Sequence, residues 1–341
     1  MYSGRPLQSS NHAGLVGLIA IVASFVAHAQ VSTASSAVPP KAKPGYRGSA
    51  LTYGHQATAY TFDRAAEPQY NPTWSHRLGI IPEWHFNDQL FVRGRLFLGQ
   101  EFTASDSTNH RNEVELSDLA LEVGVSGFTE PFTRIRIGGD VRVTLPTSKL
   151  SHGATRLLAI GPGLALSRTF GFGLTVAYTG RYSYRFHRYT TGLNDAPSIA
   201  ACGNPLAAAC AEFLTTGRRN AHSDLTHGAA IGFAPIEKLS INAAFHLSHL
   251  WLYPLAAVPA ELGPITEARD TPMRSFTNFE LAVSWQLFKP IGITVGASTF
   301  SPQLNTYGTR YFPLFNRNTT LYLDLSFDVE AAVSGLLGES T

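Results

Sequence analysis

Apolar and polar side chains alternate along most of this chain with a period of two. The segment 133–145 is the clearest case. One parity holds the apolar residues Ile135, Ile137, Val141, Val143 and Leu145, and the other holds Arg134, Arg136, Asp140, Arg142 and Thr144. Successive side chains of a β-strand point to opposite faces, so this pattern predicts a strand with one apolar and one polar face.

Comparable alternation recurs along the chain and predicts an all-β protein of about twelve strands. The predicted strands are Gly48–Phe62, Ser75–Phe86, Leu90–Phe102, Glu113–Ser126, Thr133–Leu145, Thr155–Arg168, Gly171–Tyr189, Ala221–Pro235, Lys238–Tyr253, Arg274–Phe288, Ile291–Ser301 and Thr319–Glu330. Most of them exceed the roughly 9 to 11 residues that a tilted strand needs to cross a membrane. The first has the weakest pattern, because its apolar residues are scattered among small polar ones.

A soluble sandwich would show the same alternation, so two further features are needed to identify a membrane barrel. Aromatic residues gather near strand ends, where a lipid interface favours them: Trp84, Phe86, Tyr182, Tyr184, Phe186, Trp251 and Tyr253. Short and long connections also alternate strictly, and the longest are residues 190–220, 254–273 and 302–318. Bacterial barrels have short periplasmic turns and long external loops, so we predict a transmembrane antiparallel up-and-down β-barrel with both termini in the periplasm.

The amino terminus favours export. The run Gly14 to Ala27 is apolar but too short to span a bilayer as a helix, and it leads into the small-x-small ending Ala27, His28, Ala29. We therefore predict a cleaved secretory signal peptide over residues 1–29, with a retained anchor as the alternative. Residues 30–45 are rich in Ser, Ala, Pro and Lys and read as a flexible periplasmic lead, followed by the barrel over residues 46–341.

Composition sets limits on the partners. Hydrophobic residues make up 44% of the chain and charged residues 15%, and the formal net charge is +2, which gives no case for nucleic-acid binding. The expected location is the outer membrane of a Gram-negative-type bacterium, with outer-membrane lipids, the barrel-assembly machinery and a small-molecule solute as partners. The sequence leaves the oligomeric state open, and no motif indicates a cofactor or a metal ion.

Charged residues of the polar parity are predicted to face the interior of the barrel. The candidate solute-binding set is Arg93, Arg95, Arg134, Arg136, Asp140, Arg142, Arg181, Arg185, Glu280 and Asp324. Arginines dominate the first half of the barrel and acids return on the last strands, so a transverse field could orient polar or anionic solutes. The alternative is that these charges pair with neighbours on adjacent strands and fill the barrel.

A catalytic alternative rests on His246 and Ser248. Their His-x-Ser spacing resembles that of outer-membrane lipid hydrolases such as the phospholipase A and lipid A deacylase families, in which histidine activates a serine nucleophile. In those families an asparagine follows the serine and the catalytic side chains face lipid. Here His249 follows, and the parity places both side chains in the interior, so ordinary polar lumen residues are the favoured interpretation and no enzymatic activity is predicted.

Two features of the long connections bear on the outer end of the barrel. Cys202 and Cys210 lie close together in the longest connection, and in an exported chain this favours a disulfide, with free thiols as the alternative. The apolar run Phe312 to Phe315 either folds into the mouth as a constriction or lies at the lipid surface.

The stretch 115–185 resembles a known family. Three stretches are similar to sequence motifs of the outer-membrane proteins called the meta-pathway phenol degradation family. They are Leu116–Leu121 (LSDLAL), Arg142–Ser148 (RVTLPTS) and Gly161–Phe170 (GPGLALSRTF). Ser117 and Ser148 stand where that family has glycines. The resemblance implies a transporter-like barrel that takes up small organic compounds.

These observations favour an outer-membrane channel or passive transporter for small polar or organic solutes. The first alternative is a closed structural barrel whose loops bind a partner at the surface, and the second is the lipid hydrolase using His246 and Ser248.

Overall fold

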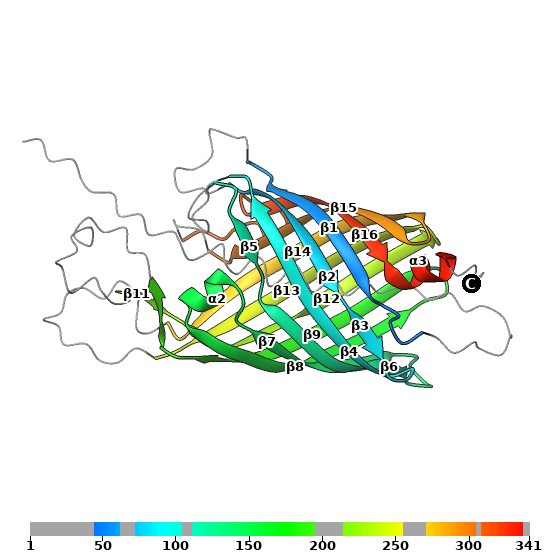
Figure 1. Ribbon diagram of the computed structural model, residues 1–341, viewed down its shortest axis with the longest axis horizontal. Coiled ribbons are helices and arrows are strands. Elements are labelled where there is room, and N and C mark those ends of the chain that lie inside the picture. Colours follow the sequence, from blue (N-terminus) through cyan, green and yellow to red (C-terminus); the bar gives the residue numbers. More distant parts are fainter. Residues whose placement is uncertain are drawn as a thin grey trace, which may run out of the picture.

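The chain folds into a closed antiparallel β-barrel (Figure 1). This computed structural model describes residues 44–61, 72–103, 111–194, 214–254, 271–304 and 308–336. The barrel closes because β1 (Ala50–Thr58) pairs with β2 (Trp74–Ile81) on one side and with β16 (Thr319–Asp328) on the other. In Figure 1 the blue β1 and the red β16 accordingly lie side by side.

The remaining wall segments follow one another in chain order around the ring. They are β3 (Glu83–His85), β4 (Leu90–Glu101), β5 (Val114–Leu116), β6 (Leu119–Thr129), β7 (Arg136–Leu145), β8 (Arg156–Thr169), β9 (Leu174–His187), β12 (Ala221–Ile236), β13 (Leu239–Leu252), β14 (Met273–Phe288) and β15 (Ile291–Pro302).

Two wall strands are each divided into two segments. Pro82 has no backbone N–H and separates β2 from β3, but the register against β4 continues unchanged, from Ile80 opposite Leu96 to Glu83 opposite Arg93. Ser117 and Asp118 separate β5 from β6, and here the register against β4 shifts by one residue, from Leu98 opposite Leu116 to Arg95 opposite Ala120. Counted as continuous strands, the described segments make a barrel of twelve, which confirms the predicted fold class.

The outer surface of the wall is apolar, as the parity predicts. Outward-facing side chains such as Val123, Val141, Val295 and Leu321 are between 47% and 55% exposed. Polar residues occur on this face too, and they bond to one another: Tyr53 Oη lies 2.9 Å from His55 Nε2, and Tyr178 Oη lies 3.2 Å from His227 Nδ1. A polar group in an apolar medium is costly unless it is hydrogen-bonded, so such contacts suit a lipid-facing wall.

Short turns and longer connections lie at opposite ends of the barrel. One end carries α2 (Lys149–Gly153) and the hairpin of β10 (Thr191–Asn194) with β11 (Leu214–Arg219), and the other carries α3 (Val329–Leu336), as Figure 1 shows. None of the helices among the described residues is long and apolar enough to cross a membrane. The predicted signal peptide, the lead up to residue 43 and both cysteines, Cys202 and Cys210, lie outside the described residues.

Several strand boundaries differ from the sequence prediction by a few residues, and two of these differences have a clear local cause. The fifth wall strand begins at Arg136 rather than at Thr133, because Glu130 caps the preceding turn by accepting hydrogen bonds from the Phe132 and Thr133 backbone N–H groups. The last strand ends at Asp328, whose carboxylate accepts from the Ala331 N–H and starts α3. Alternation alone shows neither cap.

The apolar run Phe312–Phe315 lies against the outer wall and not in the mouth. Thr299 and Thr319 have the outward parity, yet both are 0% exposed. The Thr299 hydroxyl donates to the Leu314 carbonyl at 2.8 Å, which places this segment over them. Of the two predicted positions, the structure therefore has the surface one.

Candidate functional site

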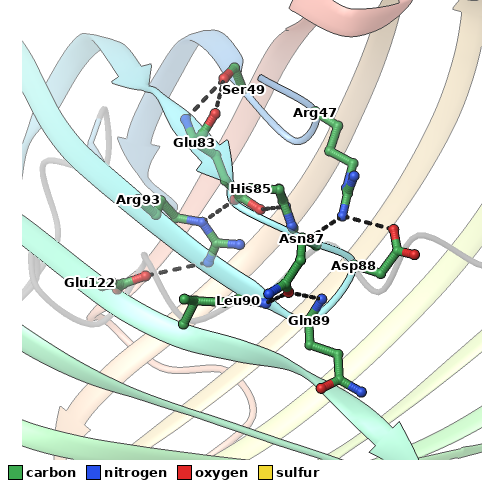
Figure 2. Close-up of polar contacts among 10 residues, drawn as sticks. All are labelled: Arg47, Ser49, Glu83, His85, Asn87, Asp88, Gln89, Leu90, Arg93 and Glu122. Carbon is green, nitrogen blue, oxygen red and sulfur yellow. Dashed lines mark hydrogen bonds and ion pairs between the residues drawn. The ribbon is translucent and has the colours of Figure 1, made fainter. Parts of the chain in front are cut away.

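A row of alternating charges crosses four neighbouring strands on the inner face of the barrel. Glu83, Arg93, Glu122 and Arg142 stand directly opposite one another in register on β3, β4, β6 and β7. Arg93 Nη1 lies 3.4 Å from Glu122 Oε2, and Arg142 Nε donates to Glu122 Oε1 at 2.6 Å. Figure 2 shows the first half of this charge row, with Arg93 between Glu83 and Glu122.

Glu122 is the centre of the charge row. It is 1% exposed, and a third guanidinium contacts it from β4, since Arg95 Nη2 lies 3.3 Å from Glu122 Oε2. One carboxylate thus faces three arginines. The sequence prediction placed the arginines here by parity but omitted Glu122 from the candidate set. The sequence of one strand does not show that a single acid will contact several arginines of neighbouring strands.

Glu83 links the charge row to the segment that precedes β1. Its carboxylate contacts Arg93 and lies 2.6 Å from His85 Nε2, while its backbone N–H donates to the Ser49 hydroxyl (Figure 2). Arg47 reaches the turn after β3, where it donates to the Asn87 carbonyl at 2.7 Å. Residues 45–49 therefore hold the short-turn end of β3 in place.

A second pair lies farther around the ring and reaches over a glycine. Arg181 on β9 contacts both carboxylate oxygens of Asp140 on β7, at 2.6 and 2.7 Å, although β8 runs between them. Gly163 of β8 stands in register with both residues. Beyond it, Arg185 Nη2 lies 2.7 Å from Asp224 Oδ1 on the neighbouring β12.

On the other side of the barrel, the charged contacts hold two acids and one arginine. Asp324 on β16 pairs with Arg77 on β2 at 3.7 Å, again across a glycine, Gly54 of β1. Glu280 on β14 accepts a hydrogen bond from Tyr322 on β16. In the ring order β14 lies six wall strands from β6, so Glu280 is on the wall opposite Glu122 and its arginines.

Near the end with the long connections, β13, β14 and β15 carry an apolar patch on the inner face. Leu250, Leu252, Phe276 and Phe300 are buried there together, and the rings of Phe276 and Phe300 stack with their centroids 5.2 Å apart. The parity of β13, β14 and β15 turns these side chains inward, on the same face as His246 and Asn278. This apolar patch lies level with a charged pair, because Leu250 stands opposite Asp224, which pairs with Arg185.

Most predicted site residues lie on the inner wall, with one correction. Arg134 lies in the turn before β7 with φ of 56° and an exposed side chain, so it is not part of the wall. Arg136 is the first residue of β7, and its Nε donates to the Ser126 carbonyl at 3.0 Å. The other eight are on strands and hold polar partners there: Arg93, Arg95, Asp140, Arg142, Arg181, Arg185, Glu280 and Asp324.

His246 and Ser248 share the inner face but bond to other residues. His246 Nε2 lies 3.1 Å from Thr179 Oγ1, and Ser248 Oγ lies 2.8 Å from Thr226 Oγ1. The His246 ring is therefore directed to Thr179 on β9, and the Ser248 hydroxyl to Thr226 on β12. Among the described residues no cluster of three or more His, Cys, Asp or Glu side chains is placed to hold a metal ion.

Two of the three stretches that carry the family resemblance, Leu116–Leu121 and Arg142–Ser148, contact each other at the long-connection end. Thr147 donates to the Ser117 carbonyl at 2.6 Å, and the Leu119 N–H donates to Thr147 at 2.9 Å. Asp118 accepts from the Ser148 N–H and pairs with Arg156 Nη1 at 2.7 Å. In this protein these residues therefore anchor the connection containing α2.

Comparison with known proteins supports the fold. The chain matches no protein family and no curated protein. Among solved structures, an outer-membrane channel from Pseudomonas putida F1 is similar, with 14% identity over 85% of this chain and 99% of that one and a TM-score of 0.53. The NanC and KdgM porins are 9% and 10% identical over 82% of this chain and 100% and 98% of theirs, with TM-scores of 0.43 and 0.42. The likeness to the channel shows a shared barrel fold.

Proposed function

We propose that this protein is an outer-membrane channel for small polar or organic solutes. The observation that carries the proposal is the direction of the inner-wall contacts. Glu122 bonds to residues of the two adjacent wall strands, and the Asp140–Arg181 and Asp324–Arg77 pairs each span one intervening strand. All of them run along the wall, so none ties one side of the barrel to the other.

The distribution of charge gives the channel a preference. The arginine–carboxylate pairs from β3 to β12 hold six arginines and five acids: Arg93, Arg95, Arg142, Arg156, Arg181 and Arg185 with Glu83, Asp118, Glu122, Asp140 and Asp224. On the other side, Arg77 stands with Glu280 and Asp324. Charges that line a pore set its selectivity, and the arginine side would attract the carboxylate or phosphate of a solute while the acid side orients its dipole.

The location and partners follow from the same proposal. The apolar outer wall faces lipid, the short turns face the periplasm, and the long connections face outward. The export signal delivers the chain to the periplasm, and the barrel-assembly machinery inserts it. The family resemblance of residues 115–185 adds small organic compounds to the solutes that should be tested.

Liposome swelling tests this function. Purified protein in liposomes is diluted into iso-osmotic solutions of small carboxylates, nucleosides and neutral sugars of matched size. We expect swelling, fastest with the carboxylates. Protein-free liposomes give the background rate, and swelling no faster than that background for every solute would refute the channel.

One observation favours a second candidate, a closed barrel with no pore. Each predicted wall charge that lies within a strand has a polar partner, as expected if these side chains serve only to fill the interior. The swelling assay separates the two functions, because a filled barrel passes no solute.

A further inference from the structure

Two of the wall ion pairs pass directly over a glycine. At Gly163 of β8, an added Cβ would lie 2.5 Å from Arg181 Nη2 and 2.8 Å from Asp140 Oδ2. Real Cβ atoms do not come this close to other heavy atoms. The Arg181–Asp140 pair therefore occupies the space that any side chain at position 163 would need.

The same arrangement recurs at Gly54 of β1, on a different part of the wall. Here an added Cβ would lie 1.9 Å from Asp324 Oδ1. Arg77, Gly54 and Asp324 stand in one row across β2, β1 and β16, just as Arg181, Gly163 and Asp140 do across β9, β8 and β7. Each glycine lies beneath the ion pair that bridges its two neighbours.

The consequence concerns the cross-section of the barrel. A long charged side chain on the inner wall either extends toward the axis or lies against the wall. The absence of a Cβ at the middle position gives it room to lie against the wall, and the opposite charge beyond the glycine fixes it there. A methyl group would lift the ion pair toward the axis.

We propose that Gly54 and Gly163 are positioning residues that keep the lumen open by holding the Arg77–Asp324 and Arg181–Asp140 pairs flat against the wall. This inference rests on the proposed channel function and adds two residues that determine its conductance. The sequence pattern marks Gly163 as a bend or bulge at a close backbone approach, but it does not show that either glycine lies beneath an ion pair.

Gly99 of β4 provides a matched control. It stands opposite Arg77 on the side away from Gly54, so it faces the same lumen in the same row. An added Cβ there would meet only the His76 carbonyl oxygen, at 3.5 Å, which is an ordinary contact. Gly296 of β15 also lies beneath an inner-wall side chain, since an added Cβ would lie 2.5 Å from the Tyr322 hydroxyl. It is unsuitable as a test position, because the same Cβ would lie 2.7 Å from the backbone carbonyl oxygen of Leu281.

The experiment compares Gly54→Ala, Gly163→Ala and Gly99→Ala in the full-length protein. Single-channel conductance in planar bilayers measures the open cross-section. Modification of Arg77 and Arg181 by phenylglyoxal, read by mass spectrometry, reports whether the guanidinium groups have left the wall. We expect lower conductance and faster modification of Arg181 in Gly163→Ala and of Arg77 in Gly54→Ala, with Gly99→Ala like the wild type in both readouts.

Equal behaviour of all three alanine variants would overturn the inference. Absence of current from the wild type would instead refute the channel, and the modification rates would still decide whether the glycines position the arginines. If Gly163→Ala does not fold, the triple variant Gly163→Ala, Asp140→Ser, Arg181→Ser removes both members of the ion pair over the methyl group. Recovery of folding then supports the inference, and continued misfolding contradicts it.

Discussion

Glu122 shows how far a residue's role depends on its neighbours. Parity places its side chain in the interior, where an isolated charge would be costly. The register brings Arg93 and Arg142 directly opposite it, and Arg95 joins from the position two residues along β4. Local alternation predicts which face a residue occupies, but the partners depend on the pairing of strands far apart in the sequence.

Replacing Glu122 should therefore destabilise the barrel. Glu122→Gln keeps the shape but removes the negative charge that three guanidinium groups share. Breaking a buried ion pair costs about 3–5 kcal/mol. Thermal unfolding in detergent, followed by the loss of heat-modifiable mobility in gel electrophoresis, measures the effect.

Glu113 is the control for that variant. It pairs with Lys149, whose side chain is 40% exposed, at 3.0 Å. A surface pair contributes roughly 0–1 kcal/mol, so Glu113→Gln should leave unfolding almost unchanged. Equal unfolding temperatures for Glu122→Gln and the wild type would show that the charge row does not stabilise the barrel.

Arg93 tests the selectivity at the same scale. Its side chain is 26% exposed, more than those of Arg95, Arg142 and Arg181, so it has better access to the lumen than they have. Arg93→Gln should shift the reversal potential in a salt gradient toward cations. Arg136→Gln, at the rim of β7, should shift it less, and the opposite order of the two variants would remove Arg93 from the solute path.

Among the elements, the connection that contains α2 depends on Asp118. The side-chain oxygens of Asp118 accept from the Ser148 N–H at 3.0 Å and from the Ser151 hydroxyl, and they pair with Arg156. Both Asp118 and Arg156 side chains are 9% exposed. The sequence marked this stretch through its family resemblance, but its contact with residues some 30 positions away appears only in the fold.

Asp118→Asn should loosen this connection while leaving the barrel intact. The loss of the charge at a largely buried hydrogen-bonded site costs about 1–3 kcal/mol. Faster hydrogen exchange at the Ser151, His152 and Ala154 amides would report it. Asp88→Asn, which removes an 88% exposed carboxylate from the pair with Arg47, should leave those amides unaffected, and equal exchange in both variants would contradict the anchoring role.

The turn before β7 has a pH dependence that can be measured. Hydrogen bonds from the Thr133 hydroxyl, the Thr133 N–H and the Phe132 N–H lower the pKa of Glu130 below its ordinary value. A lowered pKa means that this carboxylate stabilises the turn above the ordinary carboxyl pKa of about 4.3, and that the contribution is lost as the pH falls through the folded-state value.

Thr133→Val removes the hydroxyl donor and should raise the pKa of Glu130 toward its ordinary value. Nuclear magnetic resonance titration of the Glu130 carboxyl carbon in detergent micelles measures the shift. An unchanged pKa would mean that the hydroxyl bond does not form in solution.

For the whole molecule, the sequence is enough to predict the class of fold. The period of two, the even strand number and the alternating connection lengths predict a barrel of about twelve strands, and the structure has this barrel. The outer placement of the segment Phe312–Phe315 could not be predicted, because it depends on the buried Thr299 hydroxyl beneath it. The roles of Gly54 and Gly163 could not be predicted either, because each role depends on an ion pair between the two strands that flank the glycine.

The central claim is that the charges lie along the wall of an open lumen, and single-channel recording tests it most directly. Wild-type protein in a planar bilayer with a salt gradient should give discrete current steps and a reversal potential that favours anions. A membrane in which the folded protein is inserted but no current steps occur would contradict the account.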